Sequence, residues 1–135
     1  MIITAFEPDQ DLIVVAGTVW GPRGDAIEVP LALDTGSSET LLVPELTDAL
    51  GYSARDGDQP TVIRSAIGSE PGYMMRVARF SALGFDMVDF RVHVHDLPDG
   101  FGIRGLIGLS FLRQLDYDVR SILGQVRARP ASPIP

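Results

Sequence analysis

The most restrictive feature of the sequence is an apolar run that stops at a single aspartate. Residues 31–33 (Leu-Ala-Leu) lead directly into residues 34–38 (Asp-Thr-Gly-Ser-Ser). The apolar residues predict a buried strand, and the small residues after Asp34 predict a tight turn in which Gly36 permits a close backbone approach. The strand would hold the Asp34 carboxylate at the end of a rigid element, which makes Asp34 the candidate reactive group. For the tripeptide alone, an ordinary surface turn remains the alternative.

Strand and turn signals alternate along most of the chain and predict a mainly β fold. Residues 12–20 and 26–33 are typical of two strands joined by a turn at 21–24, so Asp34 directly follows the second strand of a hairpin. The 135 residues suffice for one domain with a real core but are few for two. We therefore expect a single domain over residues 1–129 and a flexible tail over 130–135.

The segments after the aspartate turn give further predictions. Residues 40–43 indicate a strand, and Pro44 opens a short helix that Gly51 closes. A loop at 68–72, between strand-like runs at 61–67 and 73–83, indicates a long hairpin. Alternation predicts a half-buried strand at 87–95, with one face (Phe90, Val92 and Val94) inward and the other (Arg91, His93 and His95) toward water. The remaining expected elements are a loop at 96–104, a short helix at 109–115, and a hairpin of 116–119 with 124–128.

Charge and composition exclude several classes of function. A net charge of −7 and a pI near 4.6 disfavour nucleic acid and anionic membranes as partners, because both repel an acidic protein. The chain has no cysteine, so it can have neither a disulfide nor a thiolate metal site. The first residues lack the pattern of a signal peptide, and no apolar run approaches the ~20 residues that span a bilayer. These features predict a cytoplasmic protein.

Three features in this order resemble the retropepsin-like aspartic proteases. They are the apolar strand that ends in residues 34–38, the glycine-bearing hairpin after it, and the segment 106–108 (Leu-Ile-Gly) that runs into a helix. The chain is similar in particular to single-domain bacterial and cellular members of that family. The resemblance implies a closed or partly open β-barrel with one or two short helices.

The resemblance also implies an activity and a site. The chain would be an aspartic endopeptidase without metal or cofactor, active as a homodimer because one chain supplies one catalytic aspartate. A protease-like module that dimerises or binds peptides without turnover is the alternative. The residues implied are Asp34, Thr35 and Gly36 as catalytic, with Leu106, Ile107 and Gly108 in support, and Ser37 as a hydroxyl that donates to the Asp34 carboxylate.

The family's flap, which closes over bound peptide, would correspond to the hairpin from about 61 to 80. Its tip would lie at Ile67, Gly68 and Ser69. Arg64, Tyr73, Met74 and Met75 would line the peptide cleft, although alternating packed and solvated strand residues explain them equally well. His93 and His95 have the spacing of metal ligands, but no third ligand cluster is visible, and histidines on a solvated strand face are the simpler interpretation.

Overall fold

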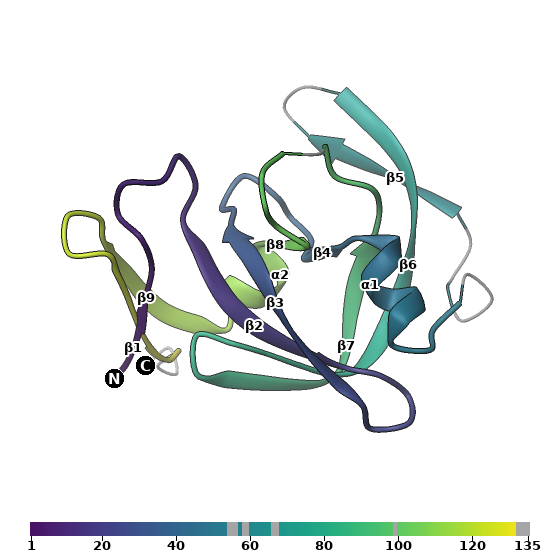
Figure 1. The fold of residues 1–135 in the computed structure, drawn as a ribbon, viewed down its shortest axis with the longest axis horizontal. Helices are drawn as coiled ribbons and strands as arrows, with labels where there is room; N and C mark the ends of the chain where they lie inside the picture. The colour runs from purple at the N-terminus through teal and green to yellow at the C-terminus, as the bar shows by residue number, and fades with distance from the viewer. Residues whose placement is uncertain (54–56, 58–59, 66–67, 99, 132–135) are drawn as a thin grey trace.

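The computed structural model describes residues 1–53, 57, 60–65, 68–98 and 100–131 (Figure 1). In chain order the elements are β1 (Ile2–Ala5), β2 (Val14–Trp20), β3 (Ala26–Leu33), β4 (Leu41–Leu42), α1 (Pro44–Ala49), β5 (Pro60–Ser65), β6 (Gly68–Ala82), β7 (Phe85–Val94), β8 (Gly105–Ile107), α2 (Leu109–Leu112), β9 (Leu115–Arg120) and β10 (Gln125–Pro130). None of the helices in these ranges is long and apolar enough to cross a bilayer.

Six strands close into a barrel. They pair in the order β2-β3-β8-β4-β7-β6, and β6 returns to pair with β2. Among the described residues, β5 pairs with β6 alone, so the β5–β6 hairpin forms an arm beyond the barrel (Figure 1). A separate sheet has the order β1-β10-β9. The expected mainly β barrel with two short helices is confirmed.

Two parallel pairs organise the barrel around the end of β3. The strand β8 runs parallel to β3, with Leu33 opposite Ile107, and β4 runs parallel to β7. The strand β4 also pairs antiparallel with β8. As a result, residues on both sides of the aspartate turn are tied to β8.

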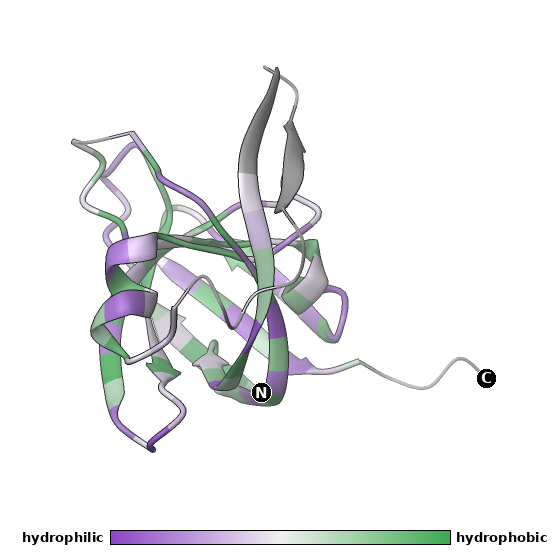
Figure 2. Cartoon of the chain, turned by 90° about the vertical axis from the view of Figure 1, so that its right-hand side faces the viewer, coloured by the Kyte–Doolittle hydropathy of each residue, from purple (hydrophilic) through white to green (hydrophobic). Residues whose placement is uncertain are grey.

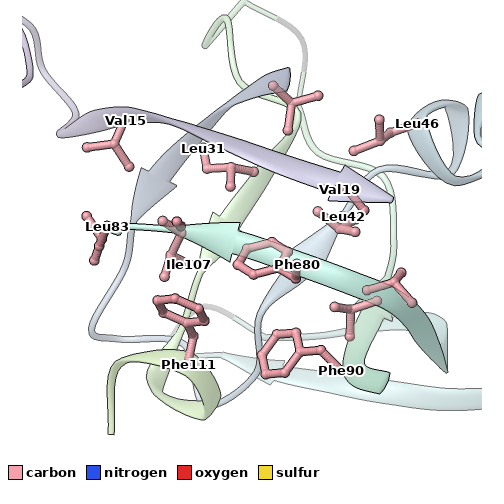
Figure 3. Packing of buried hydrophobic residues seen from close by; sticks show 14 of the residues in the cluster. Val15, Val19, Leu31, Leu42, Leu46, Phe80, Leu83, Phe90, Ile107 and Phe111 are labelled. Carbon is pink, nitrogen blue, oxygen red and sulfur yellow. The ribbon is translucent and has the colours of Figure 1, made fainter. Parts of the chain in front are cut away.

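The core fills the barrel with aliphatic side chains and a group of three phenylalanines. Phe80 lies 5.3 Å from Phe90 and 5.3 Å from Phe111 between ring centroids (Figure 3). Leu31 and Ile107, from the two strands that lead to the site, are fully buried in the same cluster. Hydrophilic and hydrophobic residues alternate along several strands (Figure 2), as expected where one face of a strand packs on a core.

The long hairpin differs from its sequence-based prediction. The loop expected at 68–72 is wrong, because Gly68 to Gly72 form the first part of β6 and pair residue by residue with β5. The glycines and the proline of this segment suggested a loop. The ladder nevertheless continues until Ser65 pairs with Gly68, and residues 66 and 67 between them lie outside the described part of the chain.

The two ends of the chain also differ from the prediction. The strand β1 was not predicted, and it pairs with β10. The helix expected at 109–115 is limited to Leu109–Leu112, because β9 begins at Leu115. Pro130 still belongs to β10, and residues 132–135 of the expected tail lie outside the described residues.

The prediction that His93 faces water is wrong. His93 is only 3% exposed. Val92 and Val94, which point to the other face of β7, are buried as well, so both faces of the strand are covered at this end, where β4 and β6 pair along its two edges. A Cβ added to Gly72 of β6 would lie 2.8 Å from His93 Nε2, so the imidazole packs directly against the root of the arm. Burial lowers the pKa of His93, and the nearby His95 and Arg91 lower it further. Within the described ranges there is no group of three His, Cys, Asp or Glu side chains placed to hold a metal.

Candidate active site

The carboxylate of Asp34 is held at the end of β3 by its own turn. The Asp34 amide donates to the Ile107 carbonyl at 2.9 Å, which continues the β3–β8 pairing by one residue. Asp34 Oδ1 accepts a hydrogen bond from the Gly36 amide at 2.9 Å. The Asp34 side chain is half-buried, whereas Thr35 and Gly36 are exposed. The turn therefore presents an oriented carboxylate that a second molecule can reach.

Gly36 is suited to this turn by size. A Cβ built on Gly36 would approach Asp34 Oδ1 to 3.2 Å, so a side chain there would crowd the carboxylate. Ser37 closes the turn, because its amide donates to the Asp34 carbonyl at 3.3 Å.

The expected hydrogen bond from the Ser37 hydroxyl to the carboxylate is not present. Ser37 Oγ donates to the Glu39 carbonyl at 2.8 Å. A serine hydroxyl has one proton to donate, so it is not available to Asp34 in this arrangement. Ser37 therefore shapes the chain after the turn and does not bond to the carboxylate.

The segment 106–108 lies directly beside the aspartate turn. Leu106 and Ile107 belong to β8, with Leu106 half-buried and Ile107 fully buried. A Cβ on Gly108 would lie 2.1 Å from the Glu39 carbonyl oxygen, so only glycine lets these two backbones pass at this distance. The helix α2 begins immediately afterwards, and its first amide, that of Leu109, donates to the Ser37 carbonyl at 2.8 Å.

Two hydroxyl side chains that the sequence did not single out complete this support. Thr40 is fully buried, and its Oγ1 accepts hydrogen bonds from the Gly108 amide at 3.2 Å and from Ser110 Oγ at 3.1 Å. In return, the Thr40 amide donates to Ser110 Oγ at 3.0 Å. The Ser110 amide donates to the Ser38 carbonyl at 2.9 Å. The chain that leaves the aspartate turn is thus fastened to the start of α2 by side chains as well as by backbone.

The residues of the arm that were expected to contact peptide lie in different environments. Gly68 and Ser69 lie in β6, where they pair with Ser65 and Arg64 of β5, and Ile67 lies outside the described residues. Tyr73 is half-buried.

The expectation that Met74 and Met75 line an open cleft is wrong for this chain. Met74 is 5% exposed and Met75 is 1% exposed. Met75 belongs to the hydrophobic core cluster, because β6 crosses onto the barrel at this point and its side chain turns inward.

The turn after β3, the loop between β7 and β8, and the arm lie on the same side of the barrel (Figure 1). One carboxylate alone can act as a base or as an acid, but it cannot hold both protonation states at once. A second titratable group is needed for any reaction that uses both.

Comparisons with known proteins agree with this geometry. Residues 15–111 match the family model described as aspartyl protease. Among solved structures, the chain is similar to a retropepsin-like aspartic protease from Rickettsia conorii, with a TM-score of 0.59 and 17% sequence identity over 95% of this chain and 91% of the other. At that identity the likeness concerns the fold. No match was found among curated proteins.

Proposed function

Because the chain belongs to the aspartyl protease family, we propose that it is an aspartic endopeptidase whose active site forms when two copies bring their Asp34 carboxyls together. The observation that carries the proposal is the braced turn at the end of β3. One oriented, accessible carboxylate is fixed there by Gly36 and β8. The sequence has a single aspartate with this apolar lead-in and small-residue turn, so the second carboxylate has to come from another chain.

Two adjacent carboxyls give the acid and the base that peptide hydrolysis needs. Like charges at close range disfavour double ionisation, so the pair shares one proton, as is general for aspartic proteases. The ionised Asp34 takes a proton from a water as its oxygen attacks the scissile carbonyl carbon, while the protonated Asp34 donates to the carbonyl oxygen. Collapse of the tetrahedral diol breaks the C–N bond, and the leaving nitrogen receives a proton from the pair. The apparent pKa values belong to the pair and not to one residue.

Residues near the carboxylate have distinct roles in this proposal. Gly36 supplies the amide that orients the carboxylate, and Thr35, at the exposed top of the turn, is positioned for contact with the partner copy. The segment 106–108 keeps the turn rigid from behind. No metal or cofactor is required in this proposal, because the carboxyl pair itself activates the water and polarises the carbonyl. We expect activity at acidic to mildly acidic pH, where one of the two carboxyls retains a proton.

The arm is proposed to act as a flap over an extended peptide. Its two strands form a ladder from Pro60 opposite Tyr73 to Ser65 opposite Gly68. A peptide in strand conformation between the arm and the aspartate turns would gain main-chain hydrogen bonds, with side-chain pockets giving preference. Of the residues expected at the tip, Gly68 and Ser69 occupy the end of this ladder, next to Ile67. Tyr73, which is half-buried at the root of the arm, is proposed to contact the peptide with its side chain.

A module that dimerises or binds peptides without turnover is the second candidate, because a shared fold does not ensure a shared activity. The Gly36 hydrogen bond to Asp34 favours the enzyme. A binding module has no need for a carboxylate whose oxygen is oriented by the backbone.

The deciding experiment is cleavage of a peptide library across pH by the wild type and by Asp34→Asn. We expect cleavage that pepstatin inhibits and that Asp34→Asn abolishes. Asp34→Asn retains an oxygen that can accept from Gly36, so its unfolding midpoint should match the wild type and serve as the control for folding. Absence of Asp34-dependent cleavage at every pH tested would reject the enzyme and leave the binding module.

A further inference from the structure

A groove lies between β7 and α2. It has a volume of about 570 Å³ and is lined by residues 86–91 of β7, by Arg76 of β6, by Ser110 of α2 with Gln114 just after that helix, and by Glu39. Only Ser110 and Glu39 also take part in the support of the aspartate turn. The rest of the groove plays no role in the site described above.

The β7 side of the groove offers apolar surface, while its charged groups are engaged with one another. Val88 is 75% exposed, and Met87 is half-buried. Arg76 Nη1 donates to the Asp89 carbonyl at 2.9 Å and lies 3.7 Å from the Asp89 carboxylate. An apolar side chain such as Val88, exposed beside a groove, is suited to contact an apolar segment.

The end of β10 brings the chain to the mouth of this groove. The Ala131 amide donates to the carbonyl of Gln114, which lines the groove, at 3.3 Å. Ala128 of β10 pairs with Ile2, and a Cβ on Gly84 would lie 2.5 Å from the Ile2 side chain. The end of β10 therefore lies close both to α2 and to the turn that leads into β7 (Figure 1).

We propose that residues 132–135 (Ser-Pro-Ile-Pro) dock in this groove, with Ile134 against Val88. These four residues lie outside the described part of the chain. Ile134 follows Ala131 by three residues, a reach of about 9 Å in the extended conformation that prolines favour. Prolines lose little conformational entropy on docking, and a tethered segment has a high effective concentration at a nearby groove. Both effects favour this segment over a separate protein or a second copy.

The docked segment would lie against the support of the aspartate turn. Ser110, which lines the groove, bonds to Thr40 through its hydroxyl. Glu39 also lines the groove, and its carbonyl accepts a hydrogen bond from Ser37 Oγ. The segment therefore braces the chain that leaves the aspartate turn. Docking requires neither a second copy nor catalysis, so its test is independent of the proposed function.

A disulfide tests the docking directly, because the chain contains no cysteine of its own. In dilute protein we expect Val88→Cys/Ile134→Cys to form an intramolecular disulfide at least tenfold faster than the control Asp116→Cys/Ile134→Cys. Asp116 is exposed and lies two residues after Gln114, so a freely moving tail reaches it as readily as Val88. Equal rates, the result for a free tail, overturn the proposal. A covalent dimer of the Val88 variant also overturns it, because a second copy then supplies the occupant.

A double-mutant cycle tests the same contact without a cross-link. We expect Ile134→Ala to lower the unfolding midpoint by about 2–5 °C, whereas Ile122→Ala, at a side chain that is 94% exposed, leaves it unchanged. Because Ile134 and Val88 are partners, Val88→Ala/Ile134→Ala should unfold close to the midpoint of either single variant. Additive losses, or an Ile134→Ala midpoint equal to that of the wild type, overturn the contact.

Discussion

Replacing Thr40 with valine should weaken both the fold and the catalysis, for one identifiable reason. Thr40 Oγ1 is the hydrogen-bond acceptor for the buried Gly108 amide, at 3.2 Å, and for Ser110 Oγ, at 3.1 Å. Valine has nearly the same shape, so no cavity forms, but the Gly108 amide loses its partner in a site closed to water. A stranded buried donor costs about 1–3 kcal/mol in the free energy of unfolding. For a chain of this length, this corresponds to an unfolding midpoint lower by roughly 4–12 °C.

The same substitution should lower kcat more than it changes KM. Thr40 does not contact the carboxylate, but it fixes the chain between the aspartate turn and α2. A small displacement of a reacting group is enough to slow the chemical step, and we expect a fall of about tenfold or more in kcat. The assay is thermal unfolding together with steady-state peptide cleavage at a temperature where every variant is folded.

Thr47 provides the matched control. It is equally buried, and its Oγ1 donates to the Pro44 carbonyl at 3.0 Å within α1. Thr47→Val should lower the unfolding midpoint and leave kcat unchanged. If Thr40→Val and Thr47→Val lose stability and keep the same kcat, the role of Thr40 in positioning the turn is refuted.

Two further substitutions test neighbouring contacts. In the unfolded chain His93 binds a proton with its ordinary pKa of 6.5, whereas in the folded chain it does so only at lower pH. The free energy of unfolding should therefore fall as the pH drops below 6.5, and this fall should be smaller in His93→Gln. Urea unfolding at pH 7.5 and pH 5 measures this, and an identical pH dependence in both proteins would contradict it. Gly108→Ala sets a Cβ 2.1 Å from the Glu39 carbonyl oxygen and should cost about 1–3 kcal/mol or more and most of the activity. In Gly24→Ala the Cβ meets open space, and only the positive φ of 92° is penalised, so peptide cleavage should persist there and not in Gly108→Ala.

The strand that leads to Asp34 and the segment 106–108 could be predicted because their sequence signals are local. The bounds of β3 are those expected, since a glycine-containing turn precedes it and the aspartate turn ends it. The segment 106–108 stood out for the same reason, as an apolar pair between glycines. In both places the residues that determine the structure are neighbours in the chain.

Other parts of the site depend on contacts between distant segments, which a local pattern does not contain. The bond between Thr40 and Ser110 joins residues 70 positions apart, and neither stands in a recognisable motif. His93 followed a correct alternation, but the pattern does not reveal that both faces of β7 are buried at its end, where Val92, His93 and Val94 are all covered. Residues 68–72 have the composition of a loop, and pairing with β5 overrides it.

The distance in sequence between the aspartate turn and its supports has a consequence during synthesis. Residues 34–38 leave the ribosome long before Ile107, Gly108 and Ser110, which hold them in place. Until those residues emerge, the nascent chain carries the complete Asp-Thr-Gly turn without the strand and helix that orient it. If the proposed function is correct, a chain interrupted before β8 is therefore expected to lack proteolytic activity, because the segment that orients the Asp34 carboxylate has not yet been synthesised.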